Sequence, residues 1–253
     1  MAFDFSNKTA LVTGASRGIG RAIAEALGAA GAQVICVAST EANAAETVAA
    51  IGSHASALGC DQSDARAVQA CAQAAIARAG RIDMLINNAG TIRRAPARDY
   101  SDADWDHVID TNLSGVFRFC RAVGGHMLDE GPRDGSRGKI VNIASLLSFQ
   151  GGITVPAYAA SKGGVAQLTK ALSNEWAGSG VQVNAIAPGY IATDNTAALR
   201  ADADRNAAIL ARIPAGRWGR SEDIAGAAMF LCSSHADYVN GHVLTVDGGW
   251  MGR

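Results

Sequence analysis

The chain has 253 residues, and its 22 Lys and Arg nearly balance its 23 Asp and Glu, so the formal net charge is −1. That balance gives no electrostatic reason to expect nucleic acid or an anionic membrane as a partner. Hydrophobic residues make up 49% and charged residues 18%, which indicates a globular chain rather than a disordered one. The N-terminal residues lack the basic start of a secretory signal, and no apolar run approaches the roughly 20 residues that cross a bilayer.

The five cysteines are scattered, odd in number and without a CxxC pair. This distribution suits reduced thiols better than a disulfide framework or a zinc site, so we expect a cytoplasmic protein. The five histidines are isolated in the sequence, and no metal site is expected.

The first elements of the chain predict a strand, a glycine turn and a helix. Residues 8–12 are rich in strand formers, and TGASRGIG follows at 13–20. Apolar residues then repeat at helical spacing as far as Gly31. Gly14, Gly18 and Gly20 let the backbone approach a phosphate and leave helix N–H groups free to bind it. In this context the turn indicates a dinucleotide site, although its glycine spacing is not the commoner GxGxxG order.

Strands and helices alternate through the rest of the chain. Further strands are predicted at residues 33–38, 54–60, 83–87, 139–144, 181–187 and 242–246, and helices at 41–51, 64–79, 105–128 and 157–177. This rhythm predicts right-handed βαβ units and a parallel sheet covered on both faces. No composition shift marks a linker, so residues 1–253 are expected to form a single α/β domain.

Polar and turn-forming residues follow the predicted strands. They are Ser39 and Thr40, Asp61 and Gln62, Asn87 to Gly90, Ser145, and Pro188 with Gly189. Turn chemistry explains each of them alone. However, ligands of doubly wound sheets bind outside the carboxyl ends of the strands, so together these residues indicate a site there.

Tyr158 and Lys162 stand four residues apart, so on the predicted helix they share a face. A free tyrosine titrates near a pH of about 10, and an ammonium one turn away would favour its phenolate. Ser145 could donate a hydrogen bond to an oxygen that gains charge. An isolated YxxxK is more often a solvated helix face, so this interpretation depends on the rest of the site.

These motifs resemble those of the short-chain dehydrogenase/reductase family. TGASRGIG, NNAG at 87–90, Asn112, Ser145, YAASK at 158–162 and PG at 188–189 occur in that family's order and at its usual separations. The resemblance implies a doubly wound Rossmann domain with a seven-stranded parallel sheet, assembled as a homotetramer. It also implies nicotinamide-dependent interconversion of an alcohol and a ketone.

The same resemblance assigns catalytic roles to four residues. Tyr158 would pass the proton to or from the substrate oxygen, and Ser145 would hold that oxygen. Lys162 would lower the tyrosine pKa and bind the nicotinamide ribose, while Asn112 would order a water molecule. The residues expected to bind the cofactor are Gly14, Ser16, Arg17, Gly18, Ile19, Gly20, Ser39, Asp61, Gln62, Asn88, Ala89, Gly90, Tyr158, Lys162, Pro188, Gly189, Ile191 and Thr193.

The choice between NAD and NADP rests on opposing signals. NAD-selective sites commonly carry an acid past the second strand, whereas this chain has Ser39 and Thr40 there. Arg17 could receive a 2′-phosphate together with Ser39, which favours NADP. A closer resemblance, to the family's dehydrogenases of deoxy sugar acids, favours NAD. We therefore expect NAD and leave NADP open.

Several segments resemble the family's dehydrogenases of deoxy sugar acids, of the 2-deoxy-D-gluconate or 2-keto-3-deoxygluconate type. They are GTIRRAP (90–96), SFQGGI (148–153), PGYIATDNT (188–196), IPAGRWG (213–219) and VDGGW (246–250). Candidate substrate residues are Arg93, Arg94, Ser145, Gln150, Tyr158, Asn195 and Trp250. A guanidinium can hold a carboxylate with two hydrogen bonds, although two neighbouring arginines are as readily a solvated surface pair. Residues 190–215 are expected to form a substrate lid or a plain surface helix.

Two alternatives remain open at this level. A 3-oxoacyl carrier-protein reductase shares the glycine turn and the YxxxK pair, and it is often NADP-linked. A protein of a different class, a non-catalytic dinucleotide-binding sensor, would keep the fold without turnover.

Overall fold

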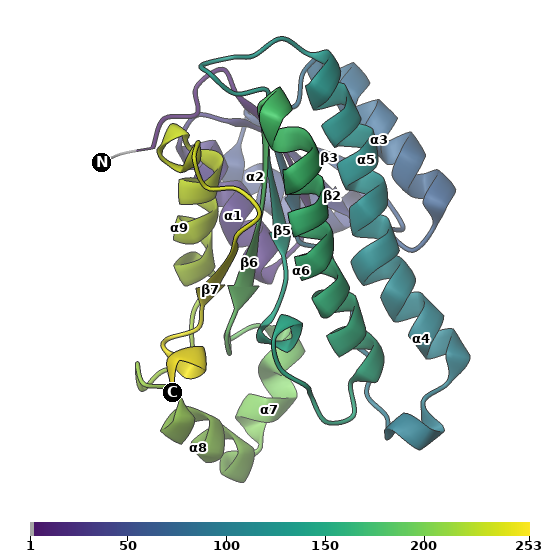
Figure 1. Cartoon of the computed structure of the whole chain (residues 1–253), viewed down its shortest axis with the longest axis vertical. Helices are drawn as coiled ribbons and strands as arrows, with labels where there is room; N and C mark the ends of the chain where they lie inside the picture. Colours follow the sequence, from purple (N-terminus) through teal and green to yellow (C-terminus); the bar gives the residue numbers. More distant parts are fainter. Residues whose placement is uncertain (1–2) are drawn as a thin grey trace.

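The computed structural model describes residues 3–253, which fold around one parallel sheet. Its seven strands lie in the order β3-β2-β1-β4-β5-β6-β7, so the chain reverses direction across the sheet between β1 and β4 (Figure 1). The strands are β1 (Thr9–Thr13), β2 (Gln33–Ala38), β3 (Ala55–Gly59), β4 (Met84–Asn87), β5 (Gly138–Ile143), β6 (Val181–Pro188) and β7 (Val243–Val246). The predicted doubly wound α/β fold is confirmed.

The strands carry apolar side chains toward both faces of the sheet, as buried parallel strands do. In β1, Ala10 and Val12 belong to one buried cluster, whereas Leu11 belongs to the other. Leu11 is the register partner of Ile35 in β2 and of Leu85 in β4, and both of these lie in the same cluster as Leu11. The continuous apolar runs of the sequence therefore bury two cores, one on each side of the sheet.

Two layers of helices cover these cores (Figure 1). On one face lie α1 (Gly18–Ala29), α2 (Ala45–Ile51) and α9 (Ser221–Cys232). The other face carries α3 (Ala65–Ala79), α5 (Gly115–Asp129) and α6 (Pro156–Trp176), and α4 (Asp102–Ile109) leads into α5. The sequence predicted no helix after residue 215, so α9 was not anticipated.

The helix predicted at 105–128 is broken in the structure. A π-helical turn, Asp110–Ser114, separates α4 from α5. The side chain of Asn112, inside this turn, bonds the backbone of Thr91 in a neighbouring loop. A contact between segments 21 residues apart decides the break, which is why periodicity alone gave one continuous helix.

The segment after β6 projects beyond the carboxyl ends of the strands (Figure 1). It contains a 3-10 turn (Asp194–Thr196), α7 (Ala197–Ala201) and α8 (Ala203–Arg212). We call residues 190–215 the cap segment. Its apolar side chains form a third, small cluster with Leu146 and with Trp250 near the C-terminus.

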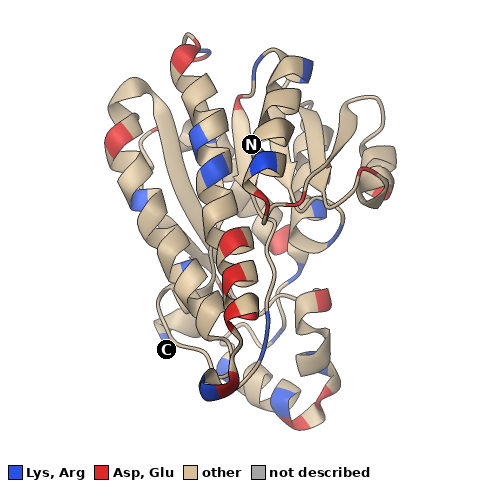
Figure 2. Cartoon of the chain, turned by 90° about the vertical axis from the view of Figure 1, so that its right-hand side faces the viewer, with Lys and Arg blue, Asp and Glu red and all other residues tan. Residues whose placement is uncertain are grey.

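Basic and acidic residues are interspersed over the helices and loops of the chain (Figure 2). Within residues 3–253, no helix combines the length and the apolar character that crossing a membrane requires.

Candidate active site

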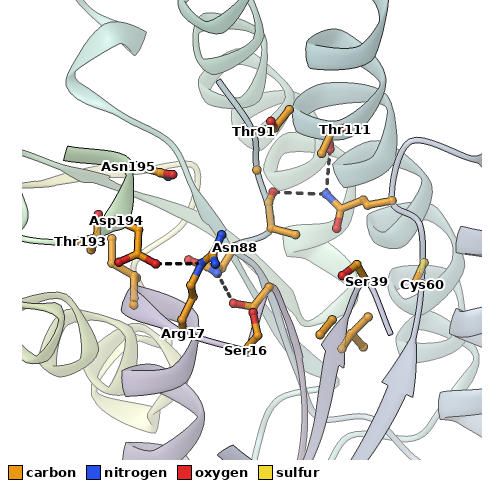
Figure 3. A pocket seen from close by; sticks show the side chains of 18 of the residues that line it. Ser16, Arg17, Ser39, Cys60, Asn88, Thr91, Thr111, Thr193, Asp194 and Asn195 are labelled. Carbon is orange, nitrogen blue, oxygen red and sulfur yellow. Dashed lines mark hydrogen bonds and ion pairs between the residues drawn. The ribbon is translucent and has the colours of Figure 1, made fainter. Parts of the chain in front are cut away.

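A cavity of about 700 Å³ lies beyond the carboxyl ends of the strands. Its walls come from the glycine turn, the ends of β2 and β3, the loop after β4, the end of α4 with the π-helical turn, and the cap segment (Figure 3). This volume is in the range typical of cofactor and ligand clefts. The position agrees with the rule that ligands of such sheets bind at the switch point of the strand order.

The glycine turn is locked against the loop after β4. Gly14 and Gly18 have φ angles of +64° and +55°, which favour glycine. A Cβ on Gly14 would lie 2.8 Å from both the Asn88 amide and the Ala89 Cα, and one on Gly20 would collide with the Gly14 carbonyl. The Asn88 Nδ2 donates to the carbonyls of Thr13 and Gly14, at 3.0 and 3.1 Å.

Helix α1 begins at Gly18 and has no acidic residue in its first turn. Its free N–H groups and the positive end of its dipole are therefore available to an anion in the cavity. Together with the glycine cradle, this start of α1 fits the pyrophosphate of a dinucleotide.

Tyr158 and Lys162 lie one turn apart on α6, and the Lys162 Nζ is 5.7 Å from the centre of the Tyr158 ring. The helix is well placed to start here because Pro156 occupies its first turn. Lys162 is only 4% exposed, and its Nζ donates to the Ile143 carbonyl at 2.6 Å. Ser145, just past β5, lies near enough to Tyr158 to act on the pKa of its hydroxyl.

Asn112 completes this group from the π-helical turn. Its Oδ1 accepts a hydrogen bond from the Thr91 N–H at 2.8 Å, and its Nδ2 donates to the Thr91 carbonyl at 2.9 Å. The Nδ2 also donates to the Ser161 Oγ at 3.2 Å, and the Ser161 hydroxyl in turn donates to the Tyr158 carbonyl at 2.8 Å. The structure thus brings Asn112, Ser145, Tyr158 and Lys162 together, as the sequence predicted.

Burial controls the titration of both residues on α6. It raises the pKa of the Tyr158 hydroxyl, while the nearby Ser145 hydroxyl and the charge of Arg94 act in the opposite direction. Burial also lowers the pKa of Lys162 to about 8. Ser145 and Arg94 partly offset the rise in the tyrosine pKa, and the Lys162 ammonium is directed to the Ile143 carbonyl; the expected effect of Lys162 on the tyrosine pKa stays a prediction.

The two predicted arginines have different surroundings. The Arg93 guanidinium pairs with Asp104, at 3.5 Å between Nε and Oδ1. Arg94 has no ion pair among the described residues, and its charge acts on Tyr158. The next residue, Ala95, donates its N–H to the carbonyl of Thr154. Thr154 has a φ of +64°, a strained conformation for a β-branched residue, so the loop beside Arg94 is held in a specific shape.

Other predicted residues lie elsewhere than the sequence suggested. Trp250 is 5% exposed and belongs to the cap cluster, so it is a packing residue in this structure, whereas Asn195 lines the cofactor cavity. Ile191 is buried in the core, and a Cβ on Gly189 would lie 2.6 Å from the Asp247 Cα. Neither Ile191 nor Gly189 belongs to the cavity wall.

Several wall residues of the cavity were not predicted from the sequence. They are Val37, Ala38, Cys60, Thr91, His107, Thr111, Ala192 and Asp194. Asp194 follows the predicted Thr193 directly, and its carboxylate pairs with Arg17 across the cavity mouth at 3.3 Å (Figure 3). Thr111 directly precedes Asn112, so adjacency to known motifs is the signal that could have found both.

The family described as short chain dehydrogenase matches residues 8–204. The chain belongs to this family of nicotinamide-dependent oxidoreductases. It is 54% identical to the 2-dehydro-3-deoxy-D-gluconate 5-dehydrogenase of Pseudoalteromonas atlantica, over 99% of this chain and 98% of the relative.

Two solved structures with bound NADP are similar over 100% of this chain. One, from Agrobacterium tumefaciens, is provisionally described as a 2-deoxy-D-gluconate 3-dehydrogenase, with 55% identity, a TM-score of 0.90 and 99% of that chain covered. The other is a gluconate 5-dehydrogenase from Burkholderia cenocepacia J2315 in complex with NADP and tartrate. It has 40% identity, a TM-score of 0.93 and 98% of that chain covered.

Proposed function

We propose that the protein is a dehydrogenase that interconverts a secondary alcohol and a ketone on a deoxy sugar acid, of the 2-deoxy-D-gluconate or 2-keto-3-deoxygluconate type. The observation that carries the substrate class is Arg94, an exposed cation that has no ion pair among the described residues and whose charge acts on Tyr158. We infer that its guanidinium binds the carboxylate of the substrate. The similarity to dehydrogenases of such acids over 99% of the chain supports the same conclusion.

In this proposal the residues of the chain handle the proton, and the bound dinucleotide supplies or accepts the hydride. Tyr158 takes the proton of the substrate hydroxyl during oxidation and returns it during ketone reduction. Ser145, which lies near Tyr158, holds the substrate oxygen. Lys162 supplies positive charge behind the tyrosine, and Asn112 links the loop at Thr91 to the base of α6 through Ser161.

Replacement of Arg94 by alanine tests the carboxylate site. We expect the KM for a sugar acid to rise about tenfold to a hundredfold, because a charge-assisted hydrogen bond contributes roughly 1.5–3 kcal/mol. The KM for the corresponding neutral sugar should change little. Arg93→Ala is the matched control, because its guanidinium already pairs with Asp104. Equal effects of Arg94→Ala on the acid and on the neutral sugar would refute the proposal.

For the cofactor we propose use of NADP, with NAD also accepted. The expectation from sequence favoured NAD, but Ser39 and Thr40, not an acid, stand directly past β2, and Arg17 stands at the mouth of the cavity whose wall includes Ser39. The NADP bound in related structures supports this revision.

Arg17→Ala should therefore raise the KM for NADP about tenfold and leave the KM for NAD within about twofold. Steady-state kinetics with each cofactor would measure both values. A wild-type enzyme that strongly prefers NAD would contradict the NADP proposal directly.

A substrate panel separates the proposed activity from its alternatives. Rates with 2-keto-3-deoxygluconate, 2-deoxy-D-gluconate and an acetoacetyl thioester, each with both cofactors, can be followed by absorbance of the reduced nicotinamide. Faster turnover of the thioester would favour a 3-oxoacyl carrier-protein reductase. Cofactor binding without turnover of any of them would favour a non-catalytic sensor.

We further propose that the protein is a cytoplasmic homotetramer in which the cap segment closes over the substrate. Trp105 on α4 and Phe117 on α5 are each 40% exposed, which suits a helical interface. Five buried, unpaired cysteines suit a reducing compartment. Light scattering after size-exclusion chromatography would determine whether the particle has four times the mass of the 25.9 kDa chain.

A further inference from the structure

Thr154 has an unusual backbone conformation in the loop between β5 and α6. Within residues 3–253, three residues other than glycine have a positive φ, namely Asn7, Asp134 and Thr154. Asparagine and aspartate tolerate the left-handed region, whereas a β-branched threonine at φ +64° is strained. Such strain persists only where the surrounding structure imposes it, and it gathers at functional sites. The contacts of Thr154 therefore show what the strain maintains.

The carbonyl of Thr154 holds the loop that follows β4. It accepts a hydrogen bond from the Ala95 N–H at 3.1 Å. The Thr154 hydroxyl bonds locally and donates to the Ile153 carbonyl at 2.6 Å. Ile153 is 91% exposed, so burial of this neighbouring side chain does not hold the loop. The hydrogen bond to Ala95 thus ties Thr154 to a distant segment of the chain.

On its other side, Thr154 leads directly into the helix that carries Tyr158. Val155 is 6% exposed, and its carbonyl accepts a hydrogen bond from the Ala159 N–H at 3.0 Å. Pro156 then begins α6 and restricts the backbone there, and Tyr158 lies in the first helical turn. Little freedom remains between Thr154 and Tyr158.

The loop after β4 is held on both sides of its two arginines. Before them, Asn112 bonds both the N–H and the carbonyl of Thr91. After them, the Ala95 N–H is bonded to Thr154. Arg94 lies between these two attachments and directly precedes the second one. The conformation of Thr154 therefore controls where the backbone of Arg94 stands relative to α6.

We propose that Thr154 is a positioning residue that determines substrate specificity. Its left-handed backbone fixes Arg94 relative to Tyr158, and this spacing selects substrates whose carboxylate lies at a set distance from the reacting oxygen. A guanidinium binds a carboxylate well only when both groups are aligned, so a loosened loop weakens binding of an acid more than that of a neutral alcohol. The inference rests on the proposed function, in which Arg94 binds the carboxylate.

Thr154→Gly and Thr154→Asn test this role. Glycine keeps the carbonyl but adopts positive and negative φ alike, so the bond to Ala95 is no longer imposed. We expect the KM for 2-deoxy-D-gluconate to rise about fivefold to tenfold. The KM for 2-deoxy-D-glucitol, in which a hydroxymethyl group replaces the carboxylate, should rise much less. Asparagine tolerates the left-handed region, so Thr154→Asn should keep the KM for the acid within about twofold of the wild type.

The double variant Arg94→Ala/Thr154→Gly separates this role from a general structural one. If Thr154 acts through Arg94, loss of the guanidinium removes the effect, and the KM for 2-deoxy-D-gluconate rises no further than in Arg94→Ala. A residue that merely supports α6 would instead lower kcat with both substrates and add its effect in either background. Melting temperatures of all variants show whether folding is affected.

Asn7→Gly is the matched control. Asn7 has almost the same φ, +63°, and its carbonyl also accepts a hydrogen bond, from Arg133 at 2.6 Å. It is exposed and lies outside the cavity wall. This variant should leave kcat and both KM values unchanged.

Three results would overturn the proposal: an unchanged KM for 2-deoxy-D-gluconate in Thr154→Gly, an equal rise for 2-deoxy-D-glucitol, or a further rise in the double variant. If Thr154→Gly does not fold, Ala95→Pro decides instead, because it removes the N–H donor of the same hydrogen bond. Equal effects of Arg94→Ala on both substrates would count against the proposed function. A selective effect of Arg94→Ala with an unselective effect of Thr154→Gly would count against the role of Thr154 alone.

Discussion

Replacement of Tyr158 by phenylalanine is expected to reduce kcat by a factor of about 10² to 10⁴, the usual contribution of a positioned acid or base. The variant keeps the ring on α6 but loses the hydroxyl that would exchange the proton. The KM for the cofactor should change little, because the phenol does not shape the glycine cradle. Initial rates at saturating substrate and cofactor provide the measurement.

Tyr238→Phe is the control for this variant, because Tyr238 is fully exposed and outside the cavity. It should retain wild-type kinetics, and both variants should melt within a few degrees of the wild type. A Tyr158→Phe protein with activity within about tenfold of the wild type would contradict the assignment of the proton donor.

Lys162→Met is expected to lose at least about 10²-fold in kcat, since the positive charge behind Tyr158 disappears. Its effect on stability should depend on pH. Burial lowers the pKa of Lys162 from 10.5 to about 8, so between those values the unfolded chain binds more protons than the folded one. The wild-type free energy of unfolding therefore gains a contribution as pH rises from about 8 toward 10.5, and the variant lacks it.

Urea denaturation at pH 7 and at pH 9.5 measures this difference. Loss of the donor to the Ile143 carbonyl also costs stability at both pH values, so the change between the two values, and not either value alone, is the measured quantity. Lys170→Met, at an exposed position on the same helix, should show neither the activity loss nor the pH dependence. A stability difference between wild type and Lys162→Met that stays constant across this range would show that Lys162 is not a destabilised buried cation.

The sequence was sufficient for the sheet because each strand is a short, separate apolar run. It was insufficient for α9, where apolar residues such as Ile224, Met229 and Leu231 stand among small alanines and give little one-sided pattern. The break between α4 and α5 was also out of reach, because it is decided by the contact of Asn112 with Thr91.

In the candidate site, too, residues close together in the sequence could be predicted, whereas contacts between distant segments could not. Tyr158 and Lys162 were found because a helix places residues four apart on one face. The difference between Arg93 and Arg94 depends on Asp104, which lies on another element. Likewise, the bond from Gln62 to Thr111 spans 49 residues, and no spacing rule anticipates it.

Two tryptophans pack in the apolar cluster of the cap segment. Trp218 and Trp250 both belong to its small apolar cluster, the Arg212 guanidinium lies 4.0 Å from the centre of the Trp250 ring, and the Trp218 Nε1 donates to Asn206 on α8. Tryptophan emission depends on nearby charges and on contact with water. Any displacement of α8 would thus alter the surroundings of two of the four tryptophans, so the native protein carries its own fluorescent reporter of cap movement.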